Sequence, residues 1–309
     1  MTLTRISADG CRITDIRGQS VLLRGVNRSG LEYSTTPIPP EEIAVITQDW
    51  GANIVRFPFN QDWVLNGRGE LTGEDYLCLL DDAIACAADH GAYSLLDLQW
   101  LDADRPFSPN RQFVAPLPNP DTARLWSTLA QRYGANPAVM FDLFNEPHDR
   151  AQDDPYTLHR PDGTLHHSEH RRVSMTEWQP WAEHLIDTIR ADAPDTLLFI
   201  SGTDWGYDLR GFPLDRPNLV YSTHVYPNKG EDWFAAFGEL AGALPVFAAE
   251  FGGREHDVEW GRRLLDYFDA LEIGWTAWSF SDHPHLVSRE DLGPTAFGQL
   301  VRDRLRRSA

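Results

Sequence analysis

The sequence predicts an α/β protein with one domain, a (β/α)8 barrel of the TIM type. Short apolar segments with strand character alternate with helical segments along the 309 residues, which is typical of a parallel sheet with helical crossovers. Polar or charged residues follow nearly every expected strand, at the end where barrel active sites lie. No glycine-rich phosphate loop follows a strand, which argues against the alternative, a doubly wound open sheet.

The chain opens with a hairpin signal and then alternates between strands and helices. An Asp-Gly turn within residues 6–13 predicts a β-hairpin, and we expect residues 1–20 to cover the bottom of the barrel. The eight expected strands are the apolar segments 21–26, 52–59, 93–98, 139–144, 196–200, 218–223, 245–249 and 275–280. Helices are expected at 40–50, 75–90, 121–133, 177–191, 232–240, 258–271 and 295–306. The connection 204–217 has a weak helical pattern, so we expect a loop or one short turn.

Composition limits the partners of this chain. The net charge is −19 and Lys229 is the only lysine, which argues against nucleic acid, because phosphate neutralisation needs clustered cations. Three cysteines give no disulfide framework. No apolar run reaches the roughly 20 residues that span a bilayer, and no signal peptide is recognisable. We therefore expect no membrane partner, a monomer, and either a cytoplasmic protein or one whose export signal has been removed.

Residues 141–147, Phe-Asp-Leu-Phe-Asn-Glu-Pro, are the most informative segment. An apolar strand ends in Asn145 and Glu146, and Pro147 stops it because proline has no N–H for the ladder. A second apolar run, 246–253, carries Glu250. Glycosidic bond cleavage requires one acid to protonate the leaving oxygen and one carboxylate to act as nucleophile. Glu146 and Glu250 are therefore the candidate catalytic pair, with carboxyl groups expected roughly 5 Å apart, as retention of configuration requires.

The other strand ends carry residue types that bind sugars or orient carboxylates. Arg56 and a tyrosine hydroxyl would favour the charged form of the nucleophile. Asn145 can hold a ring hydroxyl, and Trp278 can stack on the apolar face of a sugar. Further candidates at strand ends or in the loops beyond them are Asn27, Asp97, Gln99, Trp100, His224, Tyr226 and Trp205, with Trp63 and Trp233 as additional sugar platforms. Each of these side chains also has a purely structural interpretation, as core packing or an ion-pair partner.

This pattern resembles glycoside hydrolase family 5, the cellulase family of retaining barrel hydrolases. The resemblance runs from residues 24–27, Arg-Gly-Val-Asn, to Trp278. It implies that Glu146 is the acid/base and Glu250 the nucleophile, without metal or cofactor. It also implies that the subsite for the sugar being cleaved is lined by five residues: Arg56, Asn145, His224, Tyr226 and Trp278.

One segment departs from the family pattern. Family members usually carry Asp-x-His at the end of the third strand, where this chain has Asp97-Leu98-Gln99. Glutamine can donate and accept hydrogen bonds but cannot become a cation. The identity of the sugar is therefore open at this position.

The resemblance implies a retaining hydrolase of β-linked glucans that works by double displacement, with endo-β-1,4-glucanase as the first choice and an oligo- or polysaccharide as its substrate. A β-mannanase or an exo-acting β-glucosidase of the same fold is the nearest alternative. Long connections at 101–120 and 148–176 would favour exo action if they closed one end of a cleft.

Two other classes are weaker. A non-catalytic carbohydrate-binding barrel would keep the aromatic platforms but lose an acid, and a Schiff-base lyase would need a lysine better placed than Lys229. Four histidines between residues 159 and 170 (His159, His166, His167 and His170) lack the spacing of a zinc-protease helix, so we expect no metal there.

Overall fold

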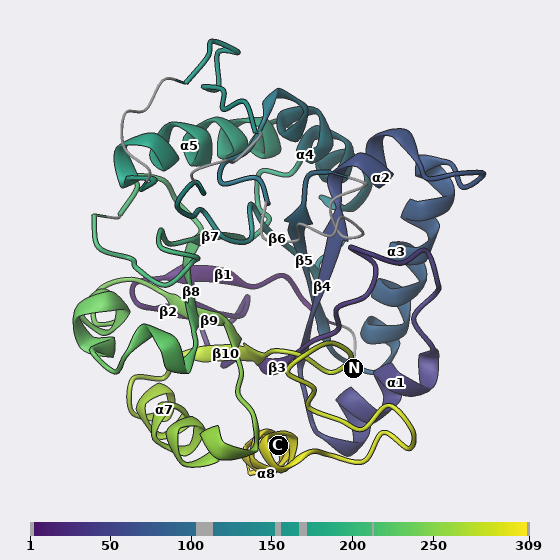
Figure 1. Ribbon diagram of the computed structural model, residues 1–309, viewed down its shortest axis with the longest axis vertical. Coiled ribbons are helices and arrows are strands. Elements are labelled where there is room, and N and C mark those ends of the chain that lie inside the picture. Colours follow the sequence, from purple (N-terminus) through teal and green to yellow (C-terminus); the bar gives the residue numbers. More distant parts are fainter. Residues whose placement is uncertain (1–2, 103–113, 152–155, 167–171, 212, 308–309) are drawn as a thin grey trace.

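A computed structural model describes residues 3–102, 114–151, 156–166, 172–211 and 213–307, and it forms a closed barrel of parallel strands surrounded by helices (Figure 1). Around the barrel the strands follow the order β10-β3-β4-β5-β6-β7-β8-β9. Their bounds are β3 (Arg24–Asn27), β4 (Ile54–Asn60), β5 (Tyr93–Trp100), β6 (Val139–Asp142), β7 (Leu198–Ser201), β8 (Leu219–Val225), β9 (Val246–Phe251) and β10 (Gly274–Ala277). The predicted (β/α)8 barrel is confirmed.

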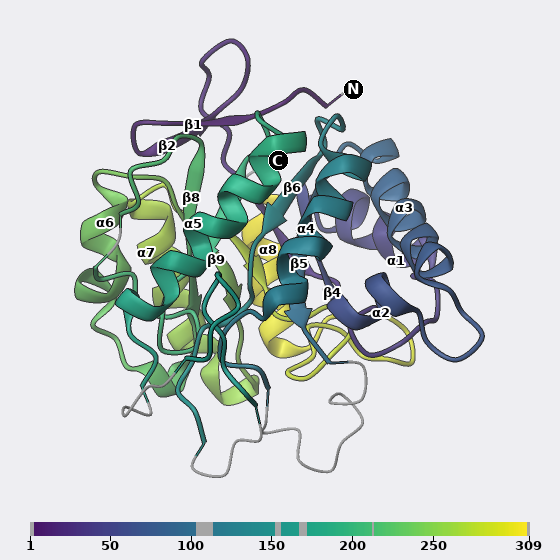
Figure 2. The ribbon, with the colours of Figure 1, turned by 90° about the horizontal axis from the view of Figure 1, so that it is seen from above.

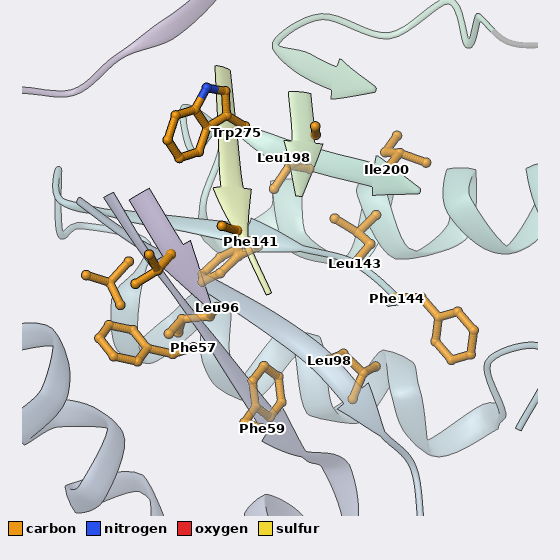
Figure 3. Packing of buried hydrophobic residues seen from close by; sticks show 14 of the residues in the cluster. Phe57, Phe59, Leu96, Leu98, Phe141, Leu143, Phe144, Leu198, Ile200 and Trp275 are labelled. Carbon is orange, nitrogen blue, oxygen red and sulfur yellow. The ribbon is translucent and has the colours of Figure 1, made fainter. Parts of the chain in front are cut away.

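The helices pack against the outer surface of this barrel. Their bounds are α1 (Pro40–Ala44), α2 (Gln61–Asn66), α3 (Gly73–Asp89), α4 (Pro120–Tyr133), α5 (Met175–Asp192), α6 (Glu239–Ala241), α7 (Val258–Ala270) and α8 (Ala296–Arg306). Outward-facing strand residues such as Phe57, Leu96 and Phe141 are buried between the strands and this helical layer (Figure 3). Both faces of each strand are thus covered, which explains the near-continuous apolar runs in the sequence.

The N-terminal hairpin lies at the end of the barrel opposite the C-terminal ends of the strands, as predicted (Figure 2). It pairs β1 (Ser7–Asp9) with β2 (Arg12–Thr14) in antiparallel register. Ile6 directly precedes β1 and Ile13 lies in β2. Both belong to a buried cluster with inward-facing strand residues such as Phe199 and Phe247. The hairpin therefore seals the bottom of the barrel with apolar contacts.

Several element boundaries differ from the sequence prediction. Helix α2 was not expected; Asn60 begins it, because its side chain accepts hydrogen bonds from the backbone N–H groups of Asp62 and Trp63. The helix expected at 232–240 is a π-helical turn, Phe234–Gly238, followed by the short α6. In the connection 204–217 the described residues contain no helix, as expected.

The ends of three strands differ from the predicted ones, and these differences decide where Glu146, His224 and Glu250 lie. Strand β6 ends at Asp142, so Glu146 lies four residues beyond it. Strands β8 and β9 run further than predicted and include His224 and Glu250. The register between these two strands shifts after Thr223, so that His224 pairs with Glu250. This bulge brings the two functional side chains next to each other.

Candidate active site

Glu146 and Glu250 face each other at the C-terminal mouth of the barrel. Glu250 is fixed by strand β9, whereas the segment before Glu146 is held by two backbone hydrogen bonds, from Leu143 N–H to Phe199 O (3.0 Å) and from Asn145 N–H to Leu98 O (3.1 Å). One carboxylate oxygen of each glutamate lies within 4.8 Å of the other. The Glu146 side chain is 20% exposed and that of Glu250 is 5% exposed, so solvent reaches the pair mainly from the Glu146 side.

Arg56 is the structural centre of the site. Its guanidinium is fully buried and donates to Glu250 Oε1 (2.9 Å), Asp142 Oδ2 (3.0 Å) and Asn145 Oδ1 (2.9 Å), and it also forms an ion pair with Asp97 (2.9 Å). Burial by itself would lower the pKa of Arg56, but attraction to the three carboxylates outweighs this effect and raises it. A permanent cation therefore holds side chains from β5, β9 and the segment 141–147 in one place.

The carboxylate of Glu250 is bound at both oxygens. Arg56 occupies Oε1, and the Tyr226 hydroxyl donates to Oε2 at 2.8 Å. Burial raises the pKa of Tyr226 well above its usual value, so the phenol stays a neutral donor. An ionised carboxylate accepts both bonds, and together they fix its orientation.

Glu146 has a different environment. Burial raises its pKa to about 7, although Arg56 and Lys229 oppose that shift. His224 Nδ1 lies 2.9 Å from Glu146 Oε1. Burial lowers the pKa of His224 to about 3, so its ring is neutral near neutral pH. Glu146 can thus keep its proton at a pH at which an ordinary glutamate has lost it.

The imidazole of His224 is held by a tightly packed backbone. Its backbone N–H donates to Gly206 O at 3.1 Å. A Cβ atom added at Gly206 would lie 2.8 Å from the imidazole ring, and the φ of Gly206 is +73°. Only glycine leaves room for the ring at this position.

Two buried aspartates, Asp97 and Asp142, form ion pairs with Arg56. Burial raises the pKa of Asp97 well above its usual value and that of Asp142 to about 6. Sequence reasoning missed Asp142, although a carboxylate inside the apolar run 141–144 was the available signal. Asn27, interpreted from the sequence as substrate-binding, is fully buried. It accepts from Arg56 (2.9 Å) and donates to the carbonyls of Ala249 (2.8 Å) and Thr276 (3.2 Å).

Burial therefore changes the interpretation of two candidates. Arg56 and Asn27 are both fully enclosed, and the groups around them are other residues of the site. Their surroundings favour a positioning role over direct contact with a substrate.

A cavity of about 220 Å³ opens among the loops at this mouth. It brings together three predicted binding residues, Gln99, Trp100 and Trp278. Trp278 directly follows β10 and donates its backbone N–H to Phe251 O (2.8 Å), next to Glu250. The remaining lining residues were not predicted and come from the loops after β3 and β10: Glu32, Tyr33, Asp282 and Arg289. Glu32 and Tyr33 follow the strand end at Asn27 within six residues. This position in the sequence was the available signal for them.

The other tryptophan candidates have different surroundings. Trp63 is fully buried and packs edge-on against Tyr76 (centroids 5.6 Å apart), and Trp233 is 6% exposed and packs against Tyr267, so of the two interpretations left open for these rings the structure supports packing and not an exposed platform. Trp205 is 36% exposed. Its ring stacks on that of His148, with centroids 3.8 Å apart, and His148 is close in sequence to Glu146. Neither ring lines the cavity.

The histidine-rich segment is only partly within the described residues. His166 Nε2 lies 2.8 Å from Glu177 Oε1 at the start of α5, and His159 Nδ1 lies 3.4 Å from Gly163 O. His167 and His170 lie outside the described residues. In the described ranges, the one group of potential metal ligands close enough to share an ion is Glu146, His224 and Glu250, the acid pair with its histidine.

Two carboxyl groups at this spacing, at the C-terminal mouth of a parallel barrel, have the arrangement of a retaining glycosidase. The family model of cellulase (glycosyl hydrolase family 5) matches residues 14–284. The chain belongs to glycosyl hydrolase family 5.

Named relatives are distant and longer than this chain. It is 22% identical to endoglucanase E-5 of Thermobifida fusca over 296 residues, covering 90% of this chain and 56% of that protein. It is 26% identical to endoglucanase MaCel5A of Microbulbifer sp. over 285 residues, covering 85% of this chain and 48% of that protein. The chain thus spans about half the length of these relatives.

Solved structures share the fold at similarly low identity. A β-glucanase of Saccharophagus degradans in complex with cellotetraose aligns with a TM-score of 0.79 at 23% identity, covering 100% of this chain and 94% of that one. The catalytic domain of Thermobifida fusca endoglucanase Cel5A aligns with a TM-score of 0.74 at 20% identity, covering 98% and 97% of the two chains. In the part of the present chain that is described, no helix combines the length and apolar character needed to cross a membrane.

Proposed function

We propose that this chain is a retaining endo-β-1,4-glucanase in which Glu250 is the nucleophile and Glu146 the acid/base. The observation that carries the proposal is the separation of the two acids, whose nearest oxygens lie within 4.8 Å, the range of retaining rather than inverting enzymes. Family membership and relatives named as endoglucanases support the choice of a β-glucan substrate. The cavity beside the pair would take a sugar unit on the ring of Trp278.

The proposed reaction proceeds in two displacements. Glu250 attacks the anomeric carbon while the protonated Glu146 gives its proton to the departing glycosidic oxygen. A covalent glycosyl-enzyme forms, and Glu146, now a carboxylate, takes a proton from the water that attacks the same carbon. Glu146 must hold a proton in the first step and lose it before the second, for which a pKa of about 7 is well suited.

The neighbouring residues act through this pair. Arg56 and Tyr226 fix both oxygens of Glu250, so the attacking atom is oriented before substrate arrives. His224 holds Glu146 by its Nδ1 contact. A neutral histidine adds no positive charge beside Glu146, which would otherwise favour early loss of the catalytic proton.

The test is the separate replacement of each acid. Glu146→Gln and Glu250→Gln are assayed on soluble β-1,4-glucan, on mannan and on a β-aryl glucoside, with the exposed Glu290→Gln as a matched control. Each active-site change is expected to lower kcat on the glucan by about 10²- to 10⁴-fold, the contribution of a catalytic acid or base. Glu290→Gln is expected to keep normal turnover.

Product analysis then separates the related activities. Random shortening of soluble glucan, with the β-anomer formed first, is expected. Release of single glucose units would support an exo-acting β-glucosidase, and preference for mannan a β-mannanase. Undiminished turnover in both glutamine variants would reject the assignment of the pair.

A further inference from the structure

Glu32 lies on a loop whose backbone is anchored from two sides. The Tyr76 hydroxyl of α3 donates to Leu31 O at 2.8 Å, and the Asn60 amide at the end of β4 donates to Glu32 O at 3.2 Å. The loop directly follows β3, so it begins at the mouth of the barrel. These bonds hold Glu32 at a defined position in the cavity wall.

The side chain of Glu32 is an unusual element of that wall. It is 1% exposed and lines the same cavity as Gln99 and Trp278. Its Oε2 accepts a 2.6 Å hydrogen bond from the Gly30 backbone N–H, which holds the carboxyl group in place. Arg28, the nearby cation, forms a 2.6 Å bond with Glu42. Glu32 is therefore a carboxyl group in a dry position, and among the described residues no guanidinium is hydrogen-bonded to it.

The protonation state follows from this environment. Burial raises the pKa of Glu32 to about 8; the charge of Asp282 acts in the same direction, while the Gly30 hydrogen bond and Arg28 oppose the shift. Near neutral pH the group is a carboxylic acid, which can donate a hydrogen bond as well as accept one. A neutral acid kept in a pocket for this purpose has a precedent in other enzymes.

Gln99 adds a second polar group to the same cavity. Its Oε1 is buried and has no hydrogen-bond partner in the described part of the chain. A buried amide oxygen without a partner is costly, and a ligand hydroxyl would satisfy it. Donor and acceptor groups beside the indole of Trp278 match a neutral pyranose, which presents hydroxyls at its edge and an apolar face.

We propose that Glu32 is a specificity-determining residue that donates a hydrogen bond from its protonated carboxyl to a hydroxyl of the sugar bound in the cavity. This inference rests on the proposed function and adds a named recognition group to it. The titratable or charged groups around Glu32 are Arg28, Tyr33, Tyr76, Asp97, Asp282 and Arg289.

Kinetics of two variants test the contact. Glu32→Gln keeps the shape and a hydrogen-bond donor, whereas Glu32→Ala removes both. On cello-oligosaccharides Glu32→Ala is expected to raise KM about tenfold, the value of one hydrogen bond, while Glu32→Gln stays within about threefold of the unchanged protein. Thermal unfolding of both variants is measured first, so that kinetics are compared only between folded proteins.

Binding in an inactive background tests the proton. Turnover falls anyway when Glu146 ionises, so Kd for cellotriose is measured by calorimetry between pH 6 and pH 9 in Glu146→Gln and in Glu146→Gln/Glu32→Gln. Kd is expected to rise about tenfold from pH 7 to pH 9 in the single variant, as Glu32 ionises and its donor is lost. The double variant is expected to show no such rise. Asp97 and Asp282 remain in both proteins, so the difference between them reports on Glu32.

The outcomes separate this inference from the function on which it rests. A Kd that follows the same pH course in both proteins, an unchanged KM in Glu32→Ala, or failure of Glu32→Gln to restore KM would each overturn the role of Glu32. If Glu146→Gln and Glu250→Gln lose turnover in the same experiments, the proposed glycosidase stands regardless. Full turnover in those two variants would reject the glycosidase itself.

Discussion

The barrel interior has two halves that the same strands build in opposite ways. Toward the hairpin, the inward-facing residues of β4, β5 and β6 are apolar, and two positions further along each of these three strands they are charged. The pairs are Ile54 and Arg56 on β4, Leu95 and Asp97 on β5, and Met140 and Asp142 on β6. Residues two apart in a strand share a face, so each of these three strands contributes one residue to a dry floor and one to a charged layer.

The two halves make different contributions to the protein. Apolar burial in the floor supplies free energy of folding without requiring a defined geometry of polar groups. The charged layer places Arg56 and three carboxylates out of water, which costs desolvation energy that their mutual attraction at best offsets. Such an arrangement is a weak source of stability, but it fixes Glu250 in one orientation. The floor stabilises the barrel, and the charged layer orients the chemistry.

Replacing the buried cation should produce the largest effect. Arg56→Met has a similar length but leaves Asp97, Asp142 and Glu250 without their common partner. We expect a loss of about 3–5 kcal/mol in the free energy of unfolding and a fall of about 10²–10³-fold in kcat/KM, since the nucleophile loses its orientation. Urea unfolding and kinetics on soluble glucan measure the two effects. Normal kcat/KM in the folded variant would contradict the role given to this layer.

A matched change in the floor should separate stability from activity. Phe199 packs edge-on against Phe247 with ring centroids 5.2 Å apart, in the cluster that includes the hairpin. Phe199→Ala is expected to lower the free energy of unfolding by about 3–5 kcal/mol. At a temperature where the variant is fully folded, kcat/KM should stay within about threefold of normal. A drop as large as that of Arg56→Met would show that the two halves are not independent.

The pH dependence of activity should distinguish the mouth from the floor by a smaller effect. Glu146 must be protonated for the first displacement, and its pKa is about 7. We therefore expect kcat/KM on glucan to fall above pH 7, approaching tenfold per pH unit. An activated aryl glycoside, whose leaving group needs no proton, should show a much weaker fall. Phe199→Ala should leave the midpoint of this fall unchanged; a shift there would indicate coupling between floor and mouth.

Local patterns carried most of the fold and the catalytic pair. Apolar runs of strand length, prolines before helices and glycines after them predicted the barrel, and the hairpin was placed at the correct end. The polar residues ending two such runs identified Glu146 and Glu250, which the closed barrel brings within 4.8 Å. Errors of a few residues at strand ends did not affect this, because every parallel strand opens toward the same face.

Burial and long-range partners were the harder part. Trp63 and Trp233 were candidate sugar platforms because the sequence places them in expected loops at the mouth, yet packing against Tyr76 and Tyr267 buries both rings. Glu32 was not predicted as a recognition residue, because its position shortly after the end of β3 was the one signal in the sequence. Its environment arises where the loop after β3 meets the cavity formed by β5 and the segment after β10.

The amino-acid order by itself determined the alternation of strands and helices and the chemical type of the group at each strand end, because both depend on neighbours in the chain. Only the tertiary structure decided which of those groups meet. Arg56 reaches partners 86 and 194 residues away, Asp142 and Glu250, once the barrel has closed. Closure also sets how deeply each carboxyl is buried, and burial is the physical reason that Glu146 keeps a proton near neutral pH.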